Sequence, residues 1–161
     1  MSKSSSPDPS RPGFHLATVE AGAVYPLRRQ VLRAGRTDLE VAFPEDERTG
    51  TIHLAAVAEG GRVLGVVTLF PQPCDRRPGA AAWHLRGMAV DPATQGRGVG
   101  RALLDEAVRR AREAGVEALW AEGRDTALGF YEGAGWKVEG EGFPAAMGLP
   151  HHSIILDLSQ R

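Results

Sequence analysis

The sequence predicts an α/β fold in which a mixed central sheet of about seven strands carries helices on both faces. Two kinds of segment support this prediction: short apolar runs with strand-like alternation, and amphipathic stretches with the three- and four-residue spacing of helices. The two kinds are interleaved without an internal repeat, in the order strand, helix, helix, three strands, helix, strand, helix and two strands. Such an order is typical of one sheet with helices packed against it.

The elements of the N-terminal half follow from local spacing and turn residues. Alternating residues predict a strand over residues 14–20, and helical spacing predicts a helix over residues 24–33. The acidic stretch 37–50 surrounds a small apolar group and is expected to form a short helix and a loop. Apolar runs over residues 52–58 and 63–70 flank a Gly-Gly turn, so we expect two antiparallel strands there.

The middle of the chain holds the clearest helix. A proline-rich loop precedes a strand expected over residues 83–90, which Asp91 and Pro92 bring to an end. In residues 99–114 the apolar side chains share one face, while charges of opposite sign recur at four-residue spacing on the other. This pattern predicts a helix, and Gly115 is its natural C-terminal stop.

The remaining elements follow the same rules. Residues 116–122 are nearly all apolar, as expected for a strand that is covered on both faces. Asp125 is expected to cap a short helix over residues 126–133. Two last strands are expected over residues 136–141 and 153–158, with a proline-containing loop between them.

Length and composition indicate one domain. A chain of 161 residues can bury a core of its own, so residues 14–161 are expected to form a single domain. Residues 1–13 are rich in Ser and Pro and lack the apolar core of a signal peptide, which predicts a flexible tail. Because Cys74 is the only cysteine, an intrachain disulfide is excluded and a cytoplasmic location is expected.

Charge and hydropathy argue against several partners. The 19 Lys and Arg nearly cancel the 20 Asp and Glu, and the arginine pairs are scattered, so nucleic acid is not expected as a partner. No apolar run approaches the length of a membrane span, so no membrane partner is expected. No cluster of His, Cys, Asp or Glu has the spacing of a metal site, so we expect no metal.

The most informative motif lies between the predicted strand 83–90 and the predicted helix 99–114, and it reads Gln95-Gly96-Arg97-Gly98-Val99-Gly100-Arg101. A helix N-terminus offers unpaired N–H groups and a positive dipole end, and glycines let phosphate oxygens approach the backbone. A nucleotide-binding P-loop would need Lys and Ser or Thr where Arg101 and Ala102 stand. A dinucleotide fingerprint would need glycine at position 101. The motif therefore predicts a phosphate site of another kind.

The Gln-x-x-Gly-x-Gly pattern resembles the signature of the GCN5-related N-acetyltransferase (GNAT) family, together with the preceding Leu85-Arg86-Gly87-Met88-Ala89-Val90-Asp91-Pro92. A second family element, the short helix and strand beside the thioester, resembles Gly129-Phe130-Tyr131-Glu132-Gly133-Ala134-Gly135-Trp136. Family members more often have Phe at the place of Trp136. The resemblance covers residues 14–158 and implies a GNAT-like acyl-CoA N-acyltransferase fold, with a mostly antiparallel sheet.

The resemblance also implies an activity. An acetyl group would pass from acetyl-CoA to a primary amine by direct attack in a ternary complex, without a metal. The acceptor would be a small molecule or a peptide, and the acidic residues 38–47 hint at a cationic one. The protein would act as a monomer or a homodimer. Two alternatives stay open, a non-catalytic sensor that binds acyl-CoA and a transferase that uses a longer acyl group.

Residues for coenzyme A follow from the same resemblance. The loop amides would grip the pyrophosphate, the strand before the loop would pair with the pantetheine arm, and a strand amide would polarise the acyl carbonyl. Arg101 could instead pair with Asp105. On the short helix, the ring of Phe130 would face the sheet and Tyr131 would point to the cofactor. The full set is Met88, Ala89, Val90, Gln95, Gly96, Arg97, Gly98, Val99, Gly100, Arg101, Ala127, Phe130 and Tyr131.

Catalysis needs a base and an acid, because the amine must be neutral and the departing sulfur must gain a proton. Tyr131 is the candidate acid, although it could instead only pack beside the pantetheine. His151 and His152 could line the acceptor pocket, but a solvated loop is the expected place for them. A water chain is a rival to the candidate bases His84, Glu122 and His53.

Overall fold

The computed structural model describes residues 13–158. The predicted flexible tail, residues 1–13, therefore lies outside the described residues except for Gly13. Within the described part, no helix is long and apolar enough to cross a membrane. No group of three or more His, Cys, Asp or Glu side chains among residues 13–158 is arranged to hold a metal ion.

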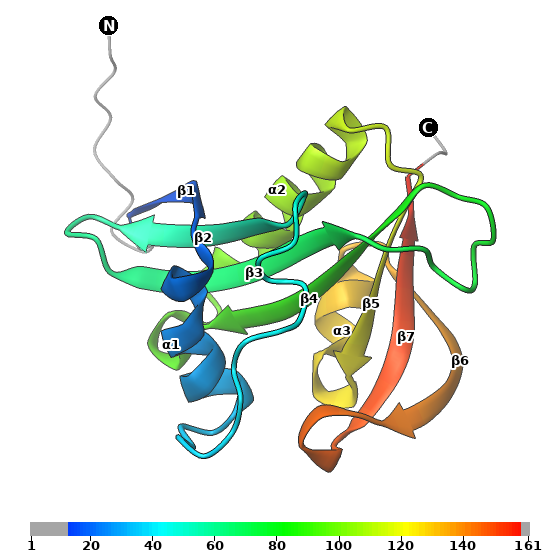
Figure 1. Ribbon diagram of the computed structural model, residues 1–161. Helices are drawn as coiled ribbons and strands as arrows, with labels where there is room; N and C mark the ends of the chain where they lie inside the picture. Colours follow the sequence, from blue (N-terminus) through cyan, green and yellow to red (C-terminus); the bar gives the residue numbers. More distant parts are fainter. Residues whose placement is uncertain (1–12, 159–161) are drawn as a thin grey trace, which may run out of the picture.

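The described residues form one seven-stranded sheet with the strand order β1-β2-β3-β4-β5-β7-β6 (Figure 1). Only β4 and β5 run parallel, and every other neighbouring pair is antiparallel. This confirms the predicted mixed, mostly antiparallel sheet. The strands are β1 (Phe14–Val19), β2 (Ile52–Ala58), β3 (Val63–Pro71), β4 (Ala82–Val90), β5 (Ala118–Arg124), β6 (Lys137–Pro144) and β7 (Pro150–Asp157).

Helices cover both faces of the sheet, as expected. One face packs against α2 (Val99–Glu113) and α3 (Leu128–Gly133) and holds the larger apolar core; we call it the α2 side. The other face, the α1 side, packs against α1 (Tyr25–Leu27) and its flanking turns, with a smaller core. Figure 1 shows α1 in front of the sheet and α2 behind it.

A glycine on β3 sets how closely α2 approaches the sheet. A Cβ atom at Gly65 would lie 2.7 Å from Val99 Cγ1 and 2.9 Å from Leu103 Cδ1, closer than side chains normally approach. Only glycine leaves room for the first turn of α2 against β3. The start of α2, and with it the glycine-rich loop, is thereby held beside the end of β4.

Two expected helices take a different form. In place of one helix over residues 24–33 the chain forms three short pieces: a 3₁₀ turn η1 (Ala21–Val24), α1, and a π turn η2 (Arg28–Leu32). Pro26 lies in the first turn of α1 and lacks an N–H, which limits regular hydrogen bonding there. The helix expected within residues 37–50 was wrong, because that segment forms only turns.

Smaller corrections concern the second half of the chain. β5 begins two residues later than expected and continues to Arg124, so both Glu122 and Arg124 lie within the strand. A 3₁₀ turn η4 (Asp125–Ala127) precedes α3, and Asp125 does not cap that helix. Its carboxylate instead accepts a hydrogen bond from His152 Nδ1 at 2.7 Å. A contact with β7 thus replaces the local cap that the sequence suggested.

Candidate active site

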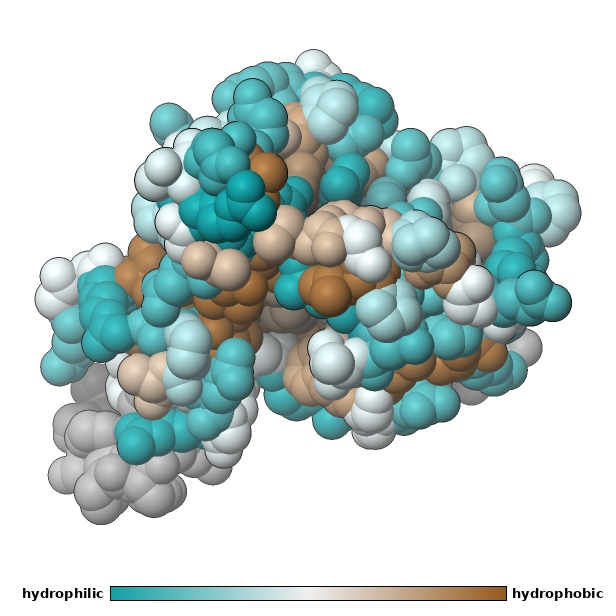
Figure 2. Space-filling model, turned by 90° about the horizontal axis from the view of Figure 1, so that it is seen from below, coloured by the Kyte–Doolittle hydropathy of each residue, from teal (hydrophilic) through white to brown (hydrophobic). Residues whose placement is uncertain are grey.

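The candidate site lies where two parallel strands separate. β4 and β5 pair only at their first positions, Ala82 with Ala118, Trp83 with Leu119 and His84 with Trp120. In Figure 1 the two arrows then diverge toward the bottom of the view. A pocket of about 460 Å³ opens in this gap, and residues from both faces of the sheet line it. Figure 2, seen from below, shows a hollow in the surface with hydrophobic side chains beside it.

A β-bulge shapes the β4 wall of this pocket. β3 pairs Thr68 with Arg86 and Val66 with Ala89, so one extra residue is inserted in β4. Gly87 in the bulge has φ +72°, a left-handed conformation that favours glycine. A Cβ atom there would lie 3.0 Å from the ring of Phe43. The bulge therefore needs glycine both for its backbone angle and for space.

The bulge also reverses the side-chain alternation of β4. Leu85 belongs to the core of the α2 side, and after the bulge Met88 and Val90 pack against that same core. Ala89 packs against the core of the α1 side. On the edge that faces β5, the strand has no partner beyond His84. Residues Met88, Ala89 and Val90, predicted to pair with pantetheine, thus lie on an open strand edge next to the pocket.

The glycine-rich loop follows β4 and leads into α2. Gly98 is the N-cap of α2 with φ +88°, and Gly96 has φ +83°. A Cβ atom at either glycine would meet nothing within 4 Å, so the space in front of the loop is open. The first hydrogen bond into the helix joins Ala102 N–H to Gly98 O. The amides of residues 99–101 therefore have no acceptor within the helix and suit an anion.

The side chains of the loop are arranged in different ways. Gln95 Nε2 donates to Val90 O at 3.3 Å, which ties the loop back to the end of β4. Arg97 is exposed beside the open space. Arg101 pairs with Asp105 at 3.0 Å, which is the structural alternative that the spacing had left open.

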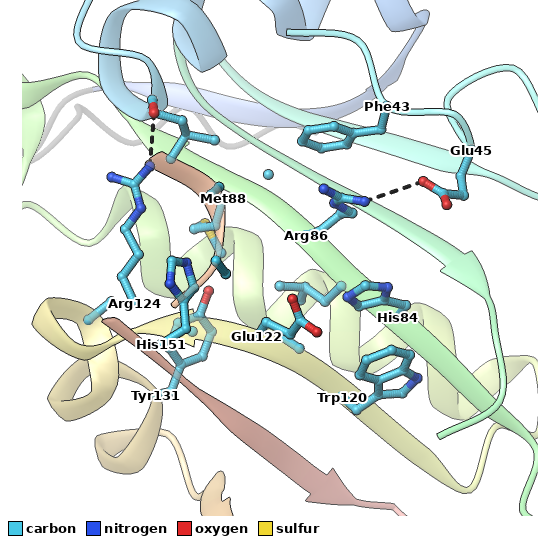
Figure 3. A pocket seen from close by; sticks show the side chains of 18 of the residues that line it. Phe43, Glu45, His84, Arg86, Met88, Trp120, Glu122, Arg124, Tyr131 and His151 are labelled. Atoms are coloured by element: carbon cyan, nitrogen blue, oxygen red, sulfur yellow. Dashed lines mark hydrogen bonds and ion pairs between the residues drawn. The ribbon is translucent and has the colours of Figure 1, made fainter. Parts of the chain in front are cut away.

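The orientation expected for Phe130 was wrong, and Tyr131 is buried more deeply than expected. Phe130 is 38% exposed, and a Cβ atom at Gly100 would lie 3.4 Å from its ring, so Phe130 stands beside the loop. Tyr131 is buried in the core of the α2 side, with its ring edge-on to Trp136 at 5.4 Å. Its hydroxyl still points toward the pocket, as Figure 3 shows, and burial raises the pKa of that hydroxyl.

β5 supplies a row of three side chains to the pocket. Trp120, Glu122 and Arg124 alternate along the strand and project from one face, while Ala121 belongs to the core of the α2 side. Figure 3 places Glu122 in the middle of this row. No side chain among residues 13–158 donates a hydrogen bond to the Glu122 carboxylate, which is exposed to the pocket.

His84, the other candidate base, is held firmly at one end of the pocket. Its ring stacks on Trp120 at 3.9 Å, and its Nδ1 lies 2.7 Å from Gln72 Oε1. Burial, together with the nearby positive charge of Arg86, lowers the pKa of His84 to about 3. The imidazole is therefore neutral near pH 7 and a weak base. The other candidate base, Glu122, is exposed to the pocket.

The wall opposite β5 is formed by the segment between η2 and β2. The ring of Phe43 lies between two guanidinium groups, each 3.8 Å from the ring centre, those of Arg28 and Arg86. Arg86 also pairs with Glu45 at 3.4 Å. Phe43, Glu45 and Arg86 all line the pocket, so this segment is part of the site although it has no regular secondary structure.

A buried ion pair fixes that segment to the sheet. Arg28, 1% exposed, donates to both carboxylate oxygens of Asp46 at 2.7 and 3.0 Å, to Val41 O and to Thr68 Oγ1. Burial alone would raise the pKa of Asp46, but the hydrogen bonds from Arg28 and from the Phe43 amide outweigh it and lower that pKa. These contacts explain why the segment needs no helix to satisfy its polar groups.

Two other histidines have contrasting places in the structure. His53 is buried in the same network, with Nδ1 2.8 Å from Thr68 Oγ1 and Nε2 3.0 Å from Asp46 O, and it does not line the pocket. His151 lies in β7 rather than in a solvated loop, is buried, and lines the pocket. Its Nδ1 donates to Leu149 O at 2.7 Å, which leaves Nε2 as an acceptor.

Sequence reasoning missed several polar side chains of the pocket. Two of them had a usable signal, because Arg124 follows Glu122, and Arg86 follows His84, by two residues on one strand face. For Arg33 and Gln72 no local pattern exists, since they reach the pocket only through tertiary contacts.

Comparisons with known proteins agree with this geometry. The family model described as "Acetyltransferase (GNAT) family" matches residues 23–136. An uncharacterised N-acetyltransferase of Bacillus subtilis (strain 168), YitI, is 28% identical over 142 residues, which cover 88% of this chain and 94% of that protein. A structure of an acyl-CoA N-acyltransferase from Pseudomonas aeruginosa matches with a TM-score of 0.72 at 17% identity, covering 89% of this chain and 99% of that one.

A second solved structure carries the cosubstrate expected from the loop. An aminoglycoside 6'-N-acetyltransferase in complex with coenzyme A matches with a TM-score of 0.72 at 16% identity. The match covers 91% of this chain and 98% of that one, and at this identity it shows the fold alone. The family match spans well over half of the chain, and the sequence motifs and the separated strands agree with it. The chain belongs to the GNAT family of acetyltransferases.

Proposed function

We propose that this protein transfers an acetyl group from acetyl-CoA to a primary amine by direct attack in a ternary complex. GNAT proteins use acetyl-CoA. The observation that carries the proposal is the pocket between β4 and β5, which is lined from both faces of the sheet. Acetyl-CoA would enter from the α2 side and the amine from the α1 side. The two reactants would then meet in the gap without a covalent enzyme intermediate.

The donor half of the pocket suits coenzyme A. The amides at the start of α2 and the open space at Gly96 and Gly98 suit its pyrophosphate. The free edge of β4 suits the pantetheine arm, which can pair with it as an added strand. An amide on this edge would donate to the acyl oxygen as negative charge develops there.

The proposed reaction assigns one proton transfer to each of two side chains. An alkyl amine has a pKa of about 10.4, so it is mostly protonated near pH 7 and must lose a proton. Glu122 accepts that proton, and the neutral amine nitrogen forms a bond to the acyl carbon. As the carbon–sulfur bond breaks, the nitrogen loses its second proton to solvent, from which Tyr131 regains the proton that it gives up. Tyr131 gives its proton to the departing sulfur, and its raised pKa keeps it protonated until then.

The phosphate loop is tested by Gly98→Val. We expect acetyl-CoA affinity to fall roughly tenfold to a hundredfold, because the side chain would stand where phosphate meets the backbone amides. The free protein should lose only about 1–2 kcal/mol of stability from the unfavourable backbone angle, since nothing lies within 4 Å of the added Cβ. Isothermal titration with acetyl-CoA measures the affinity.

A matched control is Gly60→Val in the β2–β3 hairpin. Gly60 has φ +92° and also has nothing within 4 Å of its Cβ position, so the backbone strain should be similar. Acetyl-CoA affinity should stay at the wild-type value, because the hairpin does not border the pocket. Equal affinities in the two variants would mean that the phosphates bind elsewhere.

The role of Tyr131 is tested by Tyr131→Phe. The ring and its packing against Trp136 stay, but the proton donor is lost. We expect kcat to fall roughly tenfold to a hundredfold with little change in acetyl-CoA affinity, because a thiolate is a tolerable leaving group. Tyr25→Phe on α1 is the control and should keep full turnover. A Tyr131→Phe enzyme with wild-type kcat would leave water as the acid.

A further inference from the structure

We propose that the acceptor amine carries an anionic group, a carboxylate or a phosphate, which Arg33 and Arg124 bind on the α1 side of the pocket. The inference rests on the proposed function, since it names the class of acceptor for the same reaction. Both arginines line the pocket, Arg33 just beyond η2 and Arg124 at the end of β5. Figure 3 shows Arg124 at the opposite end from His84 and Trp120, with Glu122 between them.

The two guanidinium groups meet at one backbone oxygen. Arg124 Nη2 donates to Leu32 O at 2.8 Å, and Arg33 Nη1 donates to the same oxygen at 3.2 Å. Two positive groups that share one acceptor atom must lie close to each other. The last turn of η2 and the end of β5, far apart in the sequence, thus hold two positive charges at one point of the pocket wall.

Neither of these charges is balanced by a carboxylate among residues 13–158. The other pocket arginine, Arg86, pairs with Glu45, and nearby Arg28 pairs with Asp46. Within the described part of the chain, Arg33 and Arg124 instead donate only to backbone carbonyls, those of Leu32 and Glu40. An uncompensated pair of guanidinium groups in a pocket is a common arrangement for binding carboxylate or phosphate.

The electrostatics of the two side chains agree with this arrangement. Burial, and next the charge of Arg124, lower the pKa of Arg33. Burial also lowers the pKa of Arg124. Both shifts mean that the folded protein disfavours these positive charges relative to water, although both groups stay charged at neutral pH. A bound anion would offset this effect and would accept hydrogen bonds from the guanidinium N–H groups that the backbone does not use.

The position of the pair relative to Glu122 suggests the size of the acceptor. Arg124 and Glu122 are two residues apart on one strand face, which separates their Cα atoms by about 6.6 Å. An acceptor whose anion lies on the arginines and whose amine reaches Glu122 therefore needs only a short spacer. Small amino acids and amino phosphates have such spacers.

This inference replaces the hint of a cationic acceptor from the acidic segment 38–47. Asp38 pairs with Arg36 on the surface, Asp46 is neutralised by Arg28, and Glu45 pairs with Arg86. The acidic residues of the segment are thus largely occupied by arginines. Among the described residues that line the pocket, the charged groups without an oppositely charged partner are the carboxylate of Glu122 and the two guanidinium groups.

The first test compares acceptors that differ only in the anion. Rates are measured at saturating acetyl-CoA for O-phosphoethanolamine against ethanolamine, and for β-alanine against β-alaninamide. We expect kcat/KM to be roughly tenfold to a hundredfold higher for the anionic member of at least one pair. The pair that shows this preference tells whether the site binds phosphate or carboxylate.

The two arginines are tested in the same assay. Arg33→Gln and Arg124→Gln should each reduce this preference, and Arg124→Lys should restore part of it. Arg36→Gln, outside the pocket, is the control.

The second test measures binding without turnover. Inorganic phosphate and acetate are titrated calorimetrically into protein that is saturated with coenzyme A, which already occupies the α2 loop. We expect saturable binding of one of the anions that is lost in the Arg33→Gln/Arg124→Gln double variant and kept in Arg36→Gln. Equal rates within both amine pairs, or anion binding unchanged in the double variant, would overturn the proposal. Anion binding that needs both arginines, together with no transfer to any amine, would contradict the proposed function but support the anion site.

Discussion

Asp46→Asn is expected to lower the free energy of unfolding by about 3–5 kcal/mol. The substitution keeps the shape of the side chain but removes the charge that balances Arg28, whose side chain is almost fully buried. The remaining guanidinium charge would be left in the core of the α1 side without a counter-charge. Chemical denaturation at pH 7, followed by circular dichroism, measures the change.

The matched control is Asp38→Asn in the same segment. Its pair with Arg36 has side chains that are 56% and 62% exposed, so we expect a much smaller loss of stability than for Asp46→Asn. The double variant Arg28→Met/Asp46→Leu removes both charges and should recover much of the stability. A loss below about 1 kcal/mol for Asp46→Asn would show that water reaches the pair.

The same ion pair gives stability a defined pH dependence. The folded pKa of Asp46 lies below its ordinary value of 3.8, so the unfolded chain takes up the proton first as the pH falls. The contribution of the pair is therefore fully present above the ordinary value and is lost as the pH falls through the lower folded value. The free energy of unfolding of Asp46→Asn should therefore fall less than that of the wild type over this acidic pH range.

Glu122→Gln is expected to lower kcat/KM about a hundredfold or more at pH 7, because the carboxylate proposed to take the proton of the amine is then lost. Acetyl-CoA affinity should change little, since Glu122 faces the α1 side. As the pH rises toward the amine pKa of about 10.4, more of the amine is already neutral and the defect should shrink. Initial rates across this pH range measure both effects.

Glu59→Gln, in the exposed hairpin between β2 and β3, is the control for a lost carboxylate and should keep the wild-type rate at every pH. A Glu122→Gln defect that stays constant with pH would indicate a binding role. A rate close to wild type at pH 7 would leave a water chain as the base.

Local patterns were enough to predict most of the sheet. The Gly-Gly hairpin, the α2 helix and the glycine loop each depend on residues close together in the sequence, and the structure confirms them. The separation of β4 and β5 was expected only through the family resemblance. No residue pattern predicts this separation, because a strand with one free edge and a strand with two partners have the same apolar content.

Tertiary contacts decided the features that the sequence did not reveal. Residues 37–50 carry enough apolar and acidic positions for a helix, but Arg28, from another element, satisfies their polar groups and holds them as turns. Tyr131 rather than Phe130 enters the core, because Tyr131 shares its helix face with Ala127 and Ala134, which pack against the same core. Arg33 and Arg124 meet only after η2 and β5 have folded together.

The most direct test of the central claim is acetyl transfer measured on both products at once. The protein is incubated with acetyl-CoA and a panel of small amines, amino acids, amino phosphates and peptides, while free thiol and acetylated amine are quantified. We expect coenzyme A and one acetylated amine in equal amounts, at a rate that depends on Glu122. Binding of acetyl-CoA with no amine-dependent release of coenzyme A from any member of the panel would contradict the claim and favour a sensor of acyl-CoA.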